Sequence, residues 1–101
     1  MILTREQDGE TVLLHRGDEV LLSLPENPTT GYRWAFVTEG VDLAEDTYVG
    51  QAKGATGAGG MRRVRLVVTT VGAASVSATL KRSWEGPSQA VDRCAFHFCV
   101  S

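Results

Sequence analysis

His97 and Cys99 are two residues whose side chains could serve as a catalytic base and nucleophile, or as two ligands of a metal ion. Both lie in the segment Cys94–Val100, whose alternating pattern is typical of a strand. Residues two apart on a strand share one face at about 7 Å. A zinc site needs further ligands, and the chain has no Cys-x-x-Cys pair to supply them. We therefore expect no enzyme, no catalytic residue, no metal and no cofactor.

The two cysteines, Cys94 and Cys99, are five residues apart. On a strand this odd spacing points them to opposite faces, with Cα atoms about 16 Å apart. A disulfide requires a Cα separation under about 7 Å. The sequence therefore predicts two free thiols, which mildly favour a reducing compartment.

The glycine-rich stretch Gly54–Gly60 suggests either a flexible tip or bare backbone that a partner chain can approach closely. A phosphate-binding loop would require Gly-Lys-Ser/Thr at the start of a helix. Here the run is followed by Met61-Arg62-Arg63 and a strand pattern. A nucleotide site is therefore not expected.

Length and composition indicate one globular domain spanning 1–101. The 101 residues carry a net charge of −2, and 43% of them are hydrophobic, which excludes a disordered tail or a coiled coil. No apolar stretch approaches the roughly 20 residues of a membrane span, and the charge gives no basis for nucleic-acid binding. The segment Met1–Glu6 is unlike a signal peptide, because acidic residues come early. The location stays open between the cytoplasm and export with a signal removed.

The dominant hydrophobic period is two, which predicts an all-β fold. We expect seven strands, at Thr11–His15, Glu19–Leu24, Tyr32–Val37, Asp46–Gly50, Met61–Val71, Ala73–Lys81 and Ala90–Val100. Val41–Glu45 is a candidate for a short helical turn, without a sustained 3.6-residue period. About seven short strands in about 100 residues favour an immunoglobulin-like antiparallel β-sandwich with Greek-key connections, and Trp34 fits its buried tryptophan.

Charged residues are expected on the outside of this sandwich. Arg62, Arg63 and Arg65 predict a small basic patch, in which Arg63 and Arg65 share a solvent-facing side of a strand. Asp42, Glu45 and Asp46 are interpreted as a solvated acidic cluster, because no pairing for acid–base chemistry stands out.

Three loops have the least ordinary composition: Pro25–Gly31, Gln51–Gly60 and Arg82–Gln89. If consecutive strands alternate in direction, all three emerge at one end, where a rigid sandwich presents a binding surface. The first loop contains two prolines that stiffen it, which is also compatible with an ordinary turn. In the third loop, Arg82 and Trp84 have the composition of a binding hot spot. The alternative is a Trp84 folded back on the sandwich beside a solvated Arg82.

Taken together, the three loops resemble the chagasin-type inhibitors of papain-like cysteine peptidases. That family carries Asn-Pro-Thr-Thr-Gly-Tyr/Phe, Gly-x-Gly-Gly and Arg-Pro-Trp/Phe in this order. The corresponding residues are Asn27, Pro28, Thr29, Thr30, Gly31 and Tyr32 in the first loop, Gly57, Ala58, Gly59 and Gly60 in the second, and Arg82, Ser83 and Trp84 in the third. The third motif departs from the family, because Ser83 replaces proline.

The resemblance implies reversible inhibition of a papain-like cysteine peptidase by occlusion of its active-site cleft. It places Thr29 closest to the catalytic dyad of the peptidase, with Thr30 and Gly31 shaping the loop apex. It places Gly57–Gly60 on the unprimed side of the cleft. Trp84 would stack on the primed side, with Arg82 supporting the contact. The free protein is expected to be a monomer with no nucleic-acid or membrane partner.

An immunoglobulin-like adhesion or assembly module without inhibitory activity is the alternative. Such a module would explain the fold, but it would not require the Asn27–Tyr32 motif beside the other two loops. Inhibition of papain distinguishes the two readings, because an adhesion module should leave the peptidase untouched.

Overall fold

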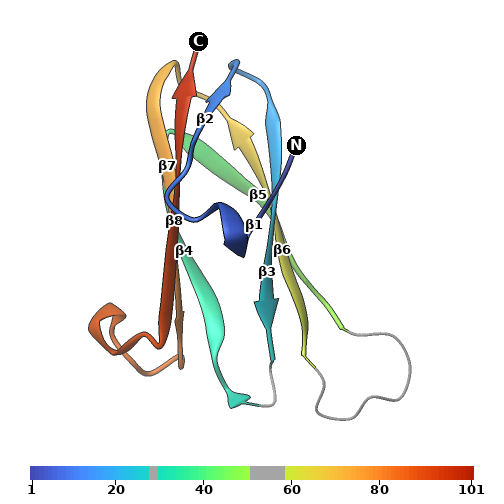
Figure 1. The fold of residues 1–101 in the computed structure, drawn as a ribbon, viewed down its shortest axis with the longest axis vertical. Helices are drawn as coiled ribbons and strands as arrows, with labels where there is room; N and C mark the ends of the chain where they lie inside the picture. The colour runs from blue at the N-terminus through green and yellow to red at the C-terminus, as the bar shows by residue number, and fades with distance from the viewer. Residues whose placement is uncertain (28–29, 51–58) are drawn as a thin grey trace.

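The fold is known from a computed structural model that describes residues 1–27, 30–50 and 59–101. In these residues the chain forms two facing four-stranded sheets (Figure 1). The elements are β1 (Ile2–Thr4), η1 (Arg5–Gln7, a 3₁₀ helix), β2 (Thr11–Leu14), β3 (Glu19–Glu26), β4 (Arg33–Glu39), β5 (Val41–Val49), β6 (Gly60–Val68), β7 (Gly72–Lys81), η3 (Pro87–Gln89, a 3₁₀ helix) and β8 (Asp92–Val100). The strand orders are β1-β3-β6-β5 and β2-β8-β7-β4. The predicted all-β sandwich is confirmed.

The core lies between the sheets and follows the alternation in the sequence. The first sheet buries Leu3, Val20, Leu22, Leu24, Val41, Val64, Leu66 and Val68, and the second buries Leu14, Trp34, Ala74, Val76, Ala78, Cys94, Phe96, Phe98 and Val100. Each fully buried large apolar side chain contributes about 1.5–3 kcal/mol from the hydrophobic effect. In the described part of the chain, no helix has the length and apolar character to cross a membrane.

The edges of the two sheets differ from the predicted pattern. Strand β1 was not expected, and its buried Leu3 adds to the core beside β3. Both β1 and β2 run parallel to their neighbours, β3 and β8, whereas the other strand pairs are antiparallel. The chain enters one sheet with β1, crosses at η1 and joins the other sheet with β2, so neither strand forms a hairpin with its partner.

The predicted helical turn at Val41–Glu45 is wrong. These residues are the first half of β5, which begins directly after Gly40 at a φ of 74°. Val41 is buried and pairs with Val68. The register then shifts between Leu43 and Glu45. Such a bulge interrupts the two-residue alternation. The sequence pattern therefore did not indicate a strand in this half of β5.

Strand β3 continues through Pro25 to Glu26, two residues beyond its predicted end. Proline cannot donate a backbone hydrogen bond and is tolerated where a strand has a free side. The short β1 pairs only with Leu21, Leu22 and Ser23, so β3 has an open side at Pro25. Its other side pairs with β6 as far as Glu26.

The strand ends that border the three unusual loops lie together. Figure 1 shows the ends of β3, β5 and β7 and the starts of β4, β6 and β8 at its lower end, with the C-terminus at the opposite end. We call this the loop end. The shared placement that was expected from alternating strands is present.

The two cysteines differ sharply in their surroundings. Both are free, as predicted, and the structure places Cys94 in the core and Cys99 at the surface. Burial raises the pKa of the Cys94 thiol to about 11. We expect a thiol-specific disulfide reagent at pH 8 to label one cysteine of the native protein within minutes and the second only after unfolding. Rapid labelling of a Cys99→Ser variant would contradict this assignment.

Arg5 lies in η1, the segment that connects the two sheets, and its side chain binds the first residue of β8, Asp92. Its Nε and Nη2 atoms donate to the Asp92 carboxylate at 3.1 and 2.7 Å. These hydrogen bonds lower the pKa of Asp92. Because the folded-state pKa is lowered, the stabilisation is present above the unfolded value of about 4 and is lost as the pH falls below it.

We expect Asp92→Asn to lower the free energy of unfolding by less than about 1 kcal/mol at pH 7, because the pair is partly exposed. The difference from the wild type should shrink towards pH 3 in urea denaturation. The exposed Asp42 provides the matched control, Asp42→Asn. A difference that is independent of pH would contradict the role of the Asp92 charge.

Candidate functional site

A buried ion pair lies at the base of the loop end. Arg62, near the start of β6, donates through Nη2 to Glu26 Oε2 at 2.6 Å, and its Nε atom donates to the same carboxylate at 3.2 Å. The side chains of Glu26 and Arg62 are 0% and 9% exposed. The hydrogen bonds to Glu26 are the main cause that raises the pKa of Arg62. The pair therefore joins the last residue of β3 to the start of β6.

Two neighbouring strands are tied to the same pair. The Trp34 backbone N–H donates to Glu26 Oε1 at 2.8 Å, and the Trp34 indole N–H donates to the Pro25 carbonyl at 2.8 Å. Arg62 also donates to Asp46 on β5 at 3.0 Å. The starts of β4 and β6, the end of β3 and a residue of β5 are thus held by one network.

The predicted basic patch is wrong for one of its three residues, Arg62. Arg62 is buried, because its side chain lies on the same inward-facing side of β6 as those of Val64 and Leu66. Arg63 is exposed, as predicted. Arg65 is half-buried on the same outer side, where it pairs with Glu19 and Glu45. The acidic cluster is likewise not simply solvated, because Glu45 and Asp46 both have arginine partners.

The first loop is described at Asn27 and from Thr30 onwards, whereas Pro28 and Thr29 lie outside the described residues. The Thr30 backbone N–H and hydroxyl both donate to the Asn27 carbonyl, at 3.2 and 2.7 Å. The Thr30 hydroxyl oxygen also accepts from the Tyr32 N–H at 3.3 Å. Gly31 has a φ of 82°, a conformation that glycine adopts without strain. These contacts join Asn27, Thr30 and Tyr32, which are described residues of this loop, to one another.

In the second loop, the structure describes Gly59 and Gly60 but not Gly57 and Ala58. Gly60 is the first residue of β6 and is buried. A Cβ atom there would lie 2.6 Å from the Tyr48 hydroxyl and would also collide with the Val49 carbonyl. The position therefore requires glycine, because β5 and β6 approach each other closely where this loop ends.

The third loop is a tight turn that presents Trp84 to solvent. The Glu85 N–H donates to the Arg82 carbonyl at 3.0 Å, and the Glu85 carboxylate accepts from the Arg82 N–H at 2.9 Å. Trp84 is 76% exposed, so it is not folded back on the sandwich. Ser83 is exposed beside it. The Arg82 guanidinium lies 4.6 Å from the Tyr32 ring centroid and 5.8 Å from that of Trp84.

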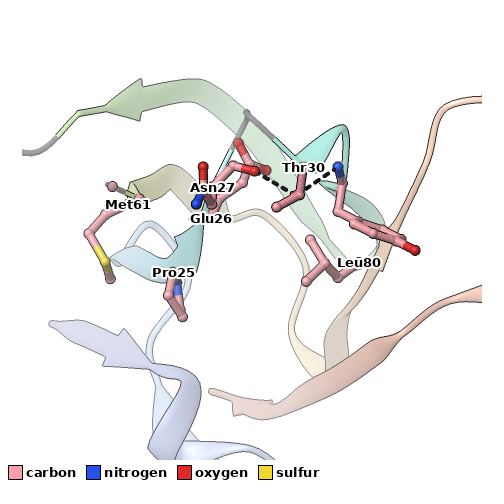
Figure 2. Close-up of a pocket in the computed structure, with 9 residues that line it drawn as sticks. Pro25, Glu26, Asn27, Thr30, Met61 and Leu80 are labelled. Carbon is pink, nitrogen blue, oxygen red and sulfur yellow. Dashed lines mark hydrogen bonds between the residues drawn. The ribbon is translucent and has the colours of Figure 1, made fainter. Parts of the chain in front are cut away.

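A hollow of about 500 Å³ opens at the loop end between the first loop and the start of β6. Figure 2 shows Pro25 and Met61 on one side of it and Leu80 on the other, with Thr30 and its hydrogen bonds above. The loop end is therefore uneven and partly apolar, which suits contact with another protein surface.

The described residues contain no group of three or more histidine, cysteine or acidic side chains that could hold a metal ion. His97 and Cys99 share the outer face of β8, in register with Thr11 and Leu13 of β2. Neither belongs to the network of hydrogen bonds and ring contacts at the loop end.

Comparisons with known proteins identify the group to which this chain belongs. The family model described as chagasin family peptidase inhibitor I42 matches residues 14–98. The chain belongs to the chagasin family. It is 32% identical over 98 residues to chagasin of Trypanosoma cruzi, covering 90% of this chain and 89% of that protein. It is 30% identical over 88 residues to amoebiasin-2 of Entamoeba histolytica, covering 83% of this chain and 72% of that protein.

Solved structures agree on the fold. The crystal structure of a cysteine protease inhibitor from Entamoeba histolytica matches with a TM-score of 0.89 at 23% identity, covering 99% of this chain and 94% of that one. This chagasin-family protein is therefore a cysteine protease inhibitor and not an enzyme, as the sequence indicated.

Sequence reasoning missed the Glu26–Arg62 pair that supports the loops of this inhibitor. The alternation of inward- and outward-facing residues along β6 could have indicated it, because Arg62 faces the same side as Val64 and Leu66. An arginine whose side chain faces the core requires a partner that can pair with its charge. Glu26 provides it from 36 positions away.

We expect Glu26→Gln to lower the free energy of unfolding by about 3 kcal/mol, because the buried Arg62 charge then keeps only the partly exposed Asp46 as a counter-ion. Urea denaturation at pH 7 measures the change. The matched control is Glu19→Gln, which breaks an exposed pair with Arg65 and should cost less than about 1 kcal/mol. Equal losses in the two variants would contradict the supporting role of Glu26.

Proposed function

We propose that this chagasin-family inhibitor blocks the active-site cleft of papain-like cysteine peptidases with the three loops of its loop end. Chagasin-family inhibitors bind peptidases of this class. The observation that carries the proposal is the exposure of Trp84, 76%, on a turn that shares the loop end with the Asn27–Tyr32 motif. A large exposed aromatic on a fixed turn is a typical anchor of a protein interface.

The assignment of roles follows the order of the loops. Thr29 is the central contact beside the catalytic dyad of the peptidase, supported by Asn27, Pro28, Thr30, Gly31 and Tyr32. The glycine-rich stretch Gly57–Gly60 flanks one side of the cleft with its backbone. Arg82, Ser83 and Trp84 flank the other. A surface of this kind buries about 1,600 Å² in a standard complex, enough for tight binding without any covalent step.

The hydrogen bonds that Thr30 donates to the Asn27 carbonyl protect the peptide bond between Asn27 and Pro28 from cleavage. Both donor groups of Thr30 hold the Asn27 carbonyl within the turn. A peptide carbonyl is attacked only when it is held in line with the nucleophile at about 3–3.5 Å. A carbonyl that already accepts two hydrogen bonds inside its own loop is not free to adopt that position.

Titration of papain and a cathepsin L-type enzyme, followed with a fluorogenic peptide, tests the proposal. We expect stoichiometric, reversible loss of peptidase activity, with the inhibitor intact by mass spectrometry afterwards. A folded protein that leaves both enzymes active at micromolar concentration would contradict it. Cleavage of the inhibitor after Asn27 during the titration would contradict the protection of that peptide bond.

Thr29→Arg tests the central contact. We expect it to abolish inhibition, because a long charged side chain at the loop apex prevents insertion into the cleft. Thr70 lies between β6 and β7, away from the loop end, and is exposed, so Thr70→Arg is the matched control and should inhibit like the wild type. Unchanged inhibition by Thr29→Arg would remove Thr29 from the interface.

A further inference from the structure

The Arg82 side chain touches two aromatic rings that come from different loops. Its guanidinium carbon lies 4.6 Å from the centroid of Tyr32 and 5.8 Å from the centroid of Trp84. Both distances fall within the range of about 6 Å in which a cation is attracted to the face of an aromatic ring. Tyr32 belongs to the first loop and Trp84 to the third, so one side chain connects two of the three binding segments.

The backbone on which this side chain stands is fixed. The Arg82 N–H and carbonyl are both engaged by Glu85, at 2.9 and 3.0 Å. The Lys81 ammonium donates to the Glu85 carbonyl at 3.0 Å, which ties the turn to the end of β7. The guanidinium therefore projects from a rigid support, although Ser83 leaves the turn without a proline.

The contact reaches further into the first loop. The Tyr32 N–H donates to the Thr30 hydroxyl, and that hydroxyl donates to the Asn27 carbonyl. A continuous path of contacts thus runs from Trp84 through Arg82 and Tyr32 to the turn at Asn27. Without Arg82, the exposed Trp84 side chain would have to be ordered at the moment of binding, at a cost in conformational entropy.

We propose that Arg82 is a positioning residue, whose guanidinium stacks on Tyr32 and Trp84 and so holds one aromatic ring of the first loop and one of the third in a fixed arrangement. Arginine suits this task because its guanidinium is planar and weakly hydrated, whereas lysine carries a compact point charge. The effect on inhibition rests on the proposed function, but the stacking belongs to the free protein and is tested there.

The first experiment needs no peptidase. The indole N–H groups of Trp34 and Trp84 are separate probes in ¹H–¹⁵N NMR, and Trp34 is a rigid reference because its indole donates to Pro25. We expect Arg82→Gln to lower the heteronuclear NOE of the Trp84 indole and to leave that of Trp34 unchanged. Arg33→Gln, at an exposed position at the start of β4, is the matched control. An unchanged Trp84 signal in Arg82→Gln would overturn the proposal.

The second experiment separates positioning from direct contact with the enzyme. We expect Arg82→Gln and Arg82→Lys each to raise the inhibition constant for papain by about tenfold, of the order of one stacked cation. Retention of wild-type inhibition by Arg82→Lys would show that charge alone suffices and would overturn the proposal. Arg33→Gln should change the constant by less than about twofold, the scale of a rim charge.

A double-mutant cycle completes the test. If Arg82 acts through Trp84, the variant Arg82→Gln/Trp84→Ala should inhibit at least about threefold better than the product of the two single effects predicts. Independent effects that multiply would show that Arg82 does not act through Trp84, which overturns the proposal. The wild type could inhibit no papain-like enzyme while Arg82→Gln still lowers the heteronuclear NOE of the Trp84 indole. In that case the proposed function fails and the stacking is supported.

Discussion

The buried ion pair between Glu26 and Arg62 is the constraint on which the loop end depends. Removing two charges from water costs several kcal/mol for each ion, and only close geometry with further hydrogen bonds offsets this cost. Here the further bonds come from Trp34 and Asp46, so the pair stabilises the native structure only when four strands are in their native places. A purely apolar contact would tolerate a shift of these strands, whereas this network does not.

The position of the pair explains its importance for binding. Glu26 is the last residue of β3 before the first loop, and Gly60 opposite it is the first residue of β6 after the second. The loops therefore leave and re-enter the sandwich at points that are fixed by hydrogen bonds. Such support lowers the ordering cost that a binding loop would otherwise meet in its complex.

The third loop is held by a different means. Among the described residues, none of the charged side chains at its base is buried, and its turn is closed by Glu85 and by the ring contacts of Arg82. In the family pattern a proline stands at the position of Ser83, where it would limit the backbone directly. In this chain the same segment is restrained by side-chain contacts, which are weaker singly and act together.

Much of the sandwich was visible in the sequence. The alternation in β7 and β8 determined which residues face the core, because a strand has a strict period of two. The motif residues of the three loops, and the parity of Cys94 and Cys99, were likewise local features. Only the tertiary structure decided that Arg62 is buried and that Pro25 lies within a strand. It also decided that Val41–Glu45 pairs with β6 and that β1 and β2 run parallel to their neighbours. Each of these features depends on a partner distant in the sequence, Glu26 for Arg62 and Val68 for Val41, and a local pattern carries no information about which distant partner is present.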